Sequence, residues 1–136
     1  MTLASNALQK AIYDRLTDQI TDTPVYDHVP QGSPMPFVRI GAITALNWDT
    51  KSDTGDELSV TIHAFDSAAG KKGVQTLLGQ IKQALHRQEA NLTLTGHALV
   101  TLEYTAADAD VEPQGEVETD RYQHGVIRFR ALVKNS

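Results

Sequence analysis

Residues 57–65 read Glu-Leu-Ser-Val-Thr-Ile-His-Ala-Phe, and this alternation of side chains decides the fold. Successive side chains of a strand point to opposite faces of a sheet. One face therefore carries Leu58, Val60, Ile62 and Ala64, and the other carries Ser59, Thr61, His63 and Phe65. Such a pattern is typical of a half-buried antiparallel strand. Together with the turn signal at 52–56 and the apolar run from Phe37, it predicts one long hairpin over 37–65.

Two amphipathic helices flank this hairpin in the sequence. Apolar residues recur every four positions over 3–20, and Ser5 or Asn6 is expected to cap the start of that helix. A second helix is predicted over 67–87, with Asp66 or Ser67 as its cap. Its apolar stripe consists of Val74, Leu77, Leu78, Ile81 and Leu85.

Short strands complete the expected order of elements. They are predicted over 25–29, 92–94, 98–106 and 121–133. In the third of these, Val100, Leu102 and Tyr104 are expected to share the apolar face. The order α-β-β-β-α-β-β-β predicts an α+β fold, with a mainly antiparallel sheet that carries a long β-hairpin and is packed by two helices.

Composition limits the classes of function. A chain of 136 residues fits one domain, 1–136, and its net charge of -5 argues against a general nucleic-acid-binding surface. It has no cysteine, and its five histidines lack metal-ligand spacing, so no metal site is expected. No nucleophile elbow or phosphate loop is present, so neither an enzyme nor a cofactor is expected. No signal peptide or membrane-spanning run is recognisable.

Two features are candidates for interaction. Trp48 lies near the predicted hairpin tip beside Asp49 and Lys51, where an exposed aromatic residue could anchor an interface; the alternative is that it folds back onto the core. The segment 108–120 carries six acids and no Lys or Arg, and is expected to be a loop or hairpin tip. It is either a solvated loop or a negative patch that repels DNA or meets a basic partner. Its acids are Asp108, Asp110, Glu112, Glu116, Glu118 and Asp120.

An ordered set of short matches runs nearly end to end and carries a resemblance to a known family. The matches lie at 7–13, 25–32, 36–41, 48–51, 60–63, 84–86, 96–100, 124–126 and 128–131. In this set of spacings the chain resembles the phage tail-completion or tail-terminator family, long catalogued as a domain of unknown function. Its members occur in tailed phages, prophages and gene transfer agents.

The resemblance implies a structural virion protein of the tail and neck, assembled in the bacterial cytoplasm. Members are similar to small α+β terminators that form a ring, commonly a hexamer, on the head-proximal end of the tail tube. The ring stops tube polymerisation and joins the tail to the head connector, and DNA passes through its lumen without sequence readout. The expected partners are therefore other copies of the chain, the tube protein and connector proteins, with no membrane involved.

We expect the 42–57 hairpin arm to contribute to the interface between ring neighbours. The candidate interface residues are Arg39, Trp48, Asp49, Lys51, Arg128 and Arg130. The acids of 108–120 are expected to face the lumen or the connector, where negative charge would keep DNA from sticking. One alternative is a head-closure or connector adaptor of the same neck. Another, from a different class, is a small-molecule enzyme of α+β fold, which would require a well-formed pocket.

Overall fold

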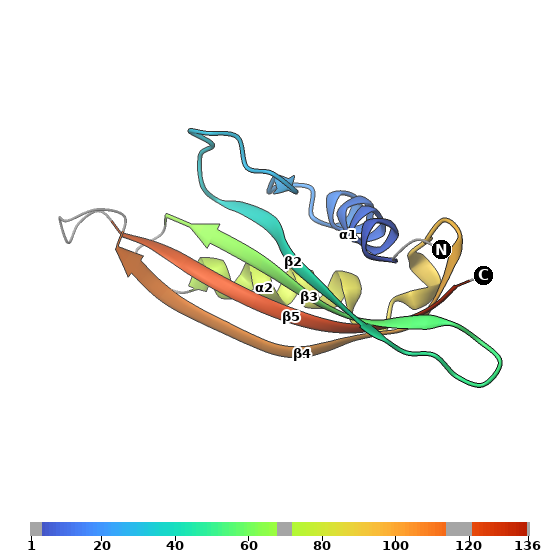
Figure 1. Ribbon diagram of the computed structural model, residues 1–136. Coiled ribbons are helices and arrows are strands. Elements are labelled where there is room, and N and C mark those ends of the chain that lie inside the picture. The colour runs from blue at the N-terminus through green and yellow to red at the C-terminus, as the bar shows by residue number, and fades with distance from the viewer. Residues whose placement is uncertain (1–3, 68–71, 114–120, 136) are drawn as a thin grey trace.

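In a computed structural model that describes residues 4–67, 72–113 and 121–135, five strands form one sheet with both α-helices on the same face (Figure 1). The elements in chain order are α1 (Ser5–Gln19), β1 (Val25–Tyr26), β2 (Phe37–Asn47), β3 (Gly55–Asp66), α2 (Lys72–Leu85), the 3-10 helix η1 (Glu89–Asn91), β4 (His97–Pro113) and β5 (Arg121–Asn135). The α+β fold and its mainly antiparallel sheet are confirmed.

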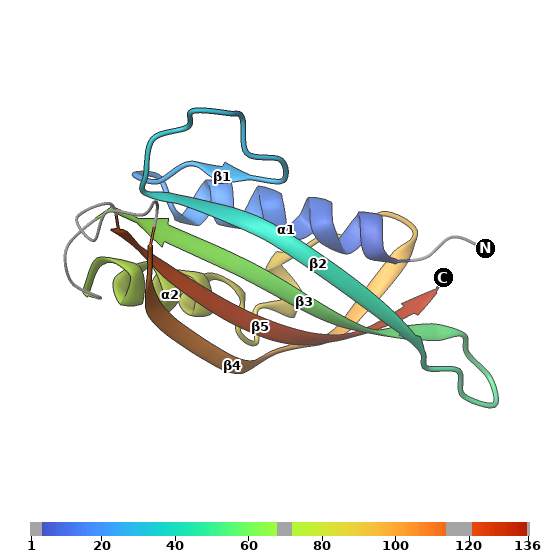
Figure 2. The ribbon, with the colours of Figure 1, turned by 60° about the vertical axis from the view of Figure 1, so that its left-hand side comes forward.

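The sheet has the strand order β1-β2-β3-β5-β4. Only the two-residue β1 is parallel to its neighbour; the other three pairings are antiparallel. The predicted hairpin exists, because β2 pairs with β3 from Phe37↔Phe65 to Asn47↔Asp56. Figure 2 shows β4 along one edge of the sheet, β2 with the short β1 on the opposite side, and the β2–β3 turn projecting beyond the sheet.

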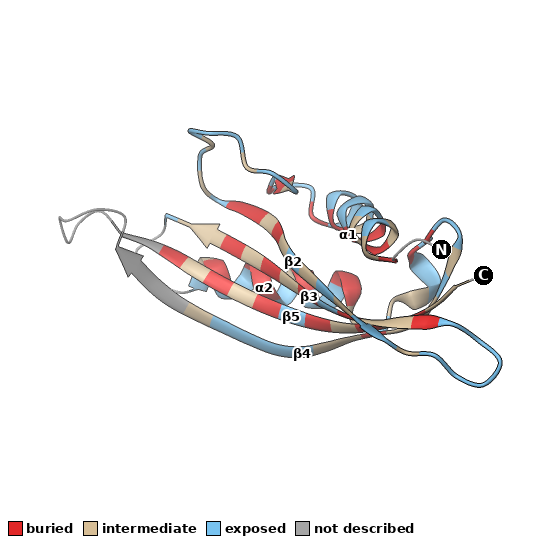
Figure 3. Ribbon diagram, in the orientation of Figure 1, coloured by how far each residue is buried: buried red, intermediate tan, exposed pale blue. Residues whose placement is uncertain are grey.

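The core lies between this sheet and the two helices. Leu8, Ile12 and Leu16 of α1 and the apolar stripe of α2 pack against one face of the sheet. The face that meets them carries the predicted residues of β3 and, from β5, Ile127, Phe129, Ala131 and Val133. Figure 3 shows the resulting alternation of buried and less buried residues along β3 and β5. The period-two pattern therefore identified the buried face correctly.

The start of α1 differs from the expectation. Neither Ser5 nor Asn6 caps it; the N-cap is Ala4, which makes no side-chain cap hydrogen bond. Ala4 is fully buried, and its carbonyl accepts the first helical bond from the N–H of Leu8 at 2.9 Å. Packing of this end on the core therefore outweighs the cap preference. The predicted caps of the second helix adjoin residues 68–71, which lie outside the described residues.

The predicted strand at 92–94 is wrong. The chain forms η1 at Glu89–Asn91 and then a loop in which Leu92 and Leu94 are both buried. Two leucines in alternation are typical of a strand, but here they bury their side chains in the core without a ladder partner among the described strands. The 3-10 turn closes with a bond from the N–H of Leu92 to the carbonyl of Glu89.

The prediction that Val100 lies on the apolar face of β4 is wrong because of a β-bulge, whereas Leu102 and Tyr104 lie on that face as predicted. The pairing of β4 with β5 shifts between Leu99 and Thr101, so Val100 is turned outward and is 44% exposed. Leu99 packs against the core instead, and Leu102 is fully buried. One inserted residue is enough to reverse the alternation of side chains on one side of a bulge.

The acidic segment is also less of a loop than expected. β4 continues through Asp108 to Pro113, and its pairing with β5 ends at Pro113↔Arg121. The long β5 supplies the backbone partners that extend β4 over this stretch. Residues 114–120, with Glu116, Glu118 and Asp120, lie outside the described residues.

The close approach of α2 to β5 predicts opposite effects for two glycines. A Cβ on Gly125 would lie 2.9 Å from both Leu78 Cδ1 and Val74 Cγ2, whereas a Cβ on Gly79 meets nothing within 4 Å. We expect Gly125→Ala to lower the free energy of unfolding by about 1–3 kcal/mol through overpacking. We expect Gly79→Ala to raise it by up to about 1 kcal/mol through helix propensity. Urea denaturation of both variants tests this, and equal effects would contradict the packing described.

Candidate functional site

The face of the sheet opposite the helices gathers the three predicted interface arginines. In the register of the sheet, Arg39 pairs with His63, Arg128 with Thr61 and Arg130 with Ser59. Directly paired residues share a face, and these positions alternate with the buried residues of β3 and β5. No helix in the described part of the chain covers this face (Figure 2). We call it the open face.

The three arginines of the open face differ in their surroundings. Arg130 already has a partner within the chain, since its Nη2 lies 3.1 Å from Glu57 Oε1 with both side chains partly exposed. An exposed pair of this kind contributes less than about 1 kcal/mol. Arg128 is exposed, and Arg39 is half-buried. Arg128 and Arg39 are therefore better placed than Arg130 to meet another molecule.

Asp108 of β4 lies on the same face as these arginines. Asp108 is exposed and pairs with Val126, which in turn pairs with His63. The backbones of Asp110 and Glu112 pair with His124 and Tyr122. The sequence predicts the arginines at a subunit or partner interface and the acids facing the lumen or the connector. The register of β4 on β5 instead brings at least Asp108 and Arg128 to one face.

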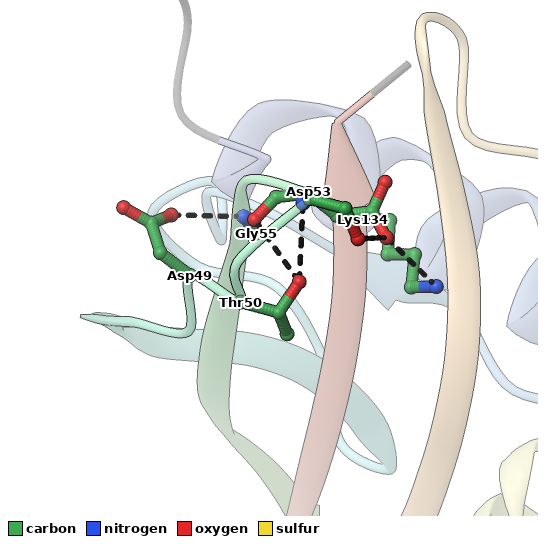
Figure 4. A network of polar contacts seen from close by, with 6 residues as sticks. Asp49, Thr50, Asp53, Gly55 and Lys134 are labelled. Carbon is green, nitrogen blue, oxygen red and sulfur yellow. Dashed lines mark hydrogen bonds and ion pairs between the residues drawn. The ribbon is translucent and has the colours of Figure 1, made fainter.

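The turn at 48–54 between β2 and β3 is braced by polar contacts (Figure 4). Asp49 Oδ1 accepts a bond from the N–H of Gly55 at 3.2 Å, and Thr50 Oγ1 accepts one from the N–H of Asp53 at 3.1 Å. Lys134 of β5 lies 3.5 Å from Asp53 Oδ2. β5 adds a backbone bond from the N–H of Asn135 to the carbonyl of Thr54 at 2.9 Å. The turn is therefore held in one shape by both its own residues and the C-terminal strand.

The projecting part of the hairpin is shorter than the predicted 42–57 arm. β3 is paired with β5 from Gly55↔Lys134 onward, so only 48–54 extends past the paired strands. Trp48 is half-buried and lies over Gly55, where a Cβ would come within 3.0 Å of its Cε3. It does not belong to the core cluster, so the alternative of folding back onto the core is not realised. Lys51 is exposed at the tip.

Sequence analysis missed a row of rings at the other end of the open face. Phe37, Phe65 and His124 lie in succession, with centroids 5.0 and 4.5 Å apart. His63 Nδ1 is 2.9 Å from His124 Nε2. Gly41 makes room for this pair, since a Cβ there would lie 2.8 Å from His63 Nε2 and 2.9 Å from the carbonyl oxygen of Thr61. The histidines are 61 residues apart in sequence, so only the β3–β5 register reveals the pair.

Among the described residues there is no group of three or more His, Cys, Asp or Glu side chains that could hold a metal ion. No helix in this part of the chain is long and apolar enough to cross a membrane. The features that stand out are a sheet face without a helix, two sheet edges and a braced turn. An uncovered sheet face and an unpaired strand edge can each contact another molecule.

Comparison with known proteins decides the family. The family described as "Tail completion protein gp17" matches residues 6–134, almost the whole chain. This chain belongs to that family. The tail completion protein gp17 of Bacillus phage SPP1 is 25% identical over 143 residues, which cover 98% of this chain and 97% of that protein.

A solved structure shares the fold. A chain from the virion of a native gene transfer agent particle superposes with a TM-score of 0.77, with 23% sequence identity, over 99% of this chain and 100% of that one. The resemblance drawn from the short sequence matches is therefore confirmed. The protein is a structural tail completion protein, not an enzyme.

The braced turn predicts a change in local opening when one brace is lost. Lys51 is the only basic residue in 48–54 and thus the only trypsin site there. Asp49→Ala removes the acceptor of the Gly55 N–H, and a lost hydrogen bond of about 1 kcal/mol should speed cleavage after Lys51 by roughly fivefold. Limited proteolysis followed by mass spectrometry measures this rate.

Ser52→Ala is the matched control for this experiment. Its hydroxyl lies 3.5 Å from Asp53 Oδ2, at the limit of a hydrogen bond, so cleavage after Lys51 should keep its original rate. Equal acceleration of cleavage by Asp49→Ala and Ser52→Ala would show that the hydrogen bond between Asp49 and the N–H of Gly55 does not hold the turn closed.

Proposed function

We propose that this protein is the tail terminator: it forms a ring on the head-proximal end of the tail tube, stops tube polymerisation and joins the tail to the head connector. One observation carries the proposal beyond membership of the family. The helices cover a single face of the sheet, which leaves the other face, two edges and a braced turn available to neighbours. A solvated sheet face is common in antiparallel sheets, so it is the combination of this face with unpaired edge stretches and a projecting turn that supports assembly with neighbours.

A ring requires two different surfaces on each subunit. A head-to-tail contact closes into a ring when its rotation closes, whereas a two-fold contact stops at a dimer. This chain has different surfaces on opposite sides of the sheet, because β1 and the part of β2 that β1 leaves unpaired form one edge and β4 forms the other. A hexamer is the ring we propose in the particle, formed by copies of this chain.

The projecting turn is suited to contact with the tail tube or with a neighbouring subunit of the ring. It extends past the ends of β4 and β5 (Figure 1). Because its shape is set by Asp49, Thr50 and Asp53, little conformational entropy is lost when it docks. We propose that Trp48, Asp49 and Lys51 contact the tube protein or a ring neighbour there. Arg39 and Arg128 on the open face would meet acidic groups of a partner.

The expected behaviour of DNA in the lumen of the proposed ring rests on the net charge of the chain more than on any single charged patch. DNA carries a dense negative charge, and a chain of net charge -5 offers it no general binding surface. We propose that DNA passes through the ring without sequence-specific contact. Asp108 shares its face with Arg128, so the wall formed there is of mixed sign and not a purely acidic one.

Electron microscopy of particles from a strain that lacks this gene tests the proposal. Without a terminator, the tube has nothing to stop its growth, so we expect tails that exceed the normal length and vary from particle to particle. Expression of the intact chain from a plasmid should restore uniform tails.

Two other outcomes would replace the proposal. Tails of normal, uniform length without this protein would contradict a terminator. Normal tails beside heads that have lost their DNA would instead identify a head-closure adaptor of the neck.

A further inference from the structure

The outer edge of β2 is unpaired over most of its length. β1 pairs only with Val38 and Arg39, and within the described residues no other strand lies beside β2 on this side. The N–H of Trp48 donates to the carbonyl of Gly55 across the hairpin at 3.0 Å. Backbone groups alternate in direction along an antiparallel strand, so those of Ile43, Ala45 and Asn47 point away from β3.

The outer edge of β4 is open over only half of its length. The N–H of Leu102 donates to Glu89 Oε2 at 2.8 Å, and the N–H of Tyr104 donates to His86 Nδ1 at 3.0 Å. The carbonyl of Leu102 accepts from the N–H of Arg87 at 2.9 Å. The connection between α2 and β4 thus closes the first half of this edge. The stretch from Ala106 to Pro113 has no neighbouring strand there among the described elements.

The two open stretches differ in chemistry. Residues 43–47 read Ile-Thr-Ala-Leu-Asn, with no charge and no proline, and Leu46 is 60% exposed. Natural edge strands are usually protected from pairing by charges, prolines, bulges or covering segments. The stretch 106–113 carries three acids and no basic residue, and it ends in Pro113. The pairing of β2 with β3 shifts between Ile40 and Ile43, so a bulge adjoins this stretch, whereas 43–47 itself pairs with β3 in regular register. A regular, uncharged edge on one side of the sheet therefore accompanies an acidic edge on the other.

These differences favour contact between unlike edges. Two β4 edges paired with each other would place three acids opposite three acids, and like charges across a ladder are destabilising. Pairing of β4 with the uncharged β2 edge avoids that repulsion. The directions also agree: β2 and β3, β3 and β5, and β5 and β4 are each antiparallel, so β2 and β4 run in opposite directions. A neighbour's β2 placed beside β4 continues the antiparallel pattern.

We propose that the β2 edge at 43–47 of one copy of this chain pairs with the β4 edge at 106–113 of the next copy, so that one sheet runs from subunit to subunit around the ring. The inference rests on the proposed ring and names its contact. Leu46 and Asp108 both belong to the open face, since Leu46 pairs with Glu57 and Asp108 with Val126. Side chains from the two strands would therefore meet on one surface across the junction.

Disulfide trapping tests this contact, because the natural chain has no cysteine. Leu46→Cys or Thr44→Cys is combined with Ala106→Cys or Asp108→Cys, all at exposed positions. Within one subunit β2 and β4 are three strand spacings apart, roughly 14 Å, which exceeds the Cα separation of about 7 Å that a disulfide tolerates. Any disulfide must therefore join two subunits.

Particles assembled from each variant in the deletion strain are oxidised mildly and separated on a non-reducing gel. We expect at least one of the four double variants to give a ladder that extends to the subunit number of the ring, while the four single variants stay monomeric. The four combinations sample three antiparallel registers, each shifted by two residues from the next, and loss of one position to misfolding leaves the other.

Two results would overturn the inference. Dimers from Leu46→Cys or Thr44→Cys alone would show two-fold pairing of β2 edges. Assembled particles without a ladder in any double variant would show that the subunits join elsewhere. Tail length in the same particles reports separately on the terminator: uniform tails without a ladder would leave that function standing and reject only this contact.

Discussion

Packing of both helices on one face of the sheet is the interaction on which the other features depend. Ile81 and Leu85 of α2 and Ile12 of α1 share one core with Ile62 and Phe129 of the sheet. Because side chains alternate along a strand, this burial sets the register. A slip of one residue in β5 would drive Arg128 and Arg130 into the core, at the cost of burying charge. The helices thereby determine which side chains remain for other molecules.

What remains uncovered indicates a protein whose role is completed by neighbours. The connection between α2 and β4 closes one half of an edge with Glu89, Arg87 and His86, and β1 closes a short part of the other. The unpaired part of β2 stands out against this partial closure. When only some stretches of a sheet edge are covered, a strand from another subunit can pair only with the stretch that is left open. A ring of limited size requires such a single, defined contact between neighbours.

Periodicity was sufficient to predict both helices, the long hairpin and the buried face of β3, because each is a run of eight or more residues with one repeat. Periodicity failed where a single inserted residue shifts the alternation of side chains along a strand. The extra residue near Val100 turns Val100 outward and Leu99 onto the core, while Leu102 and Tyr104 keep the predicted face, and no local signal marks it as a bulge. It also failed for Leu92 and Leu94, which are buried from a loop.

The candidate surfaces were predictable only in part. Arg39, Arg128 and Arg130 follow from alternation within their own strands. The pairing of Arg130 with Glu57, the contact of His63 with His124, and the placing of Asp108 beside the arginines all depend on which strands are neighbours. Strand order is set by packing between distant segments, so a single sequence contains little direct signal for it. The role in tail completion was predicted from the resemblance to a family, because the alternation and charge patterns alone do not indicate a function.

The central claim is that this sheet is incomplete until a neighbour pairs with its β2 edge. Hydrogen–deuterium exchange measured at single residues, on the free subunit and on assembled particles, tests it most directly. The account predicts that the amides of Ile43, Ala45 and Asn47, which point away from β3, exchange quickly in the free subunit and become strongly protected in the particle. The amides of Leu102 and Tyr104, already bonded to Glu89 and His86, should change little. Unchanged exchange at 43–47 in the assembled particle would contradict it.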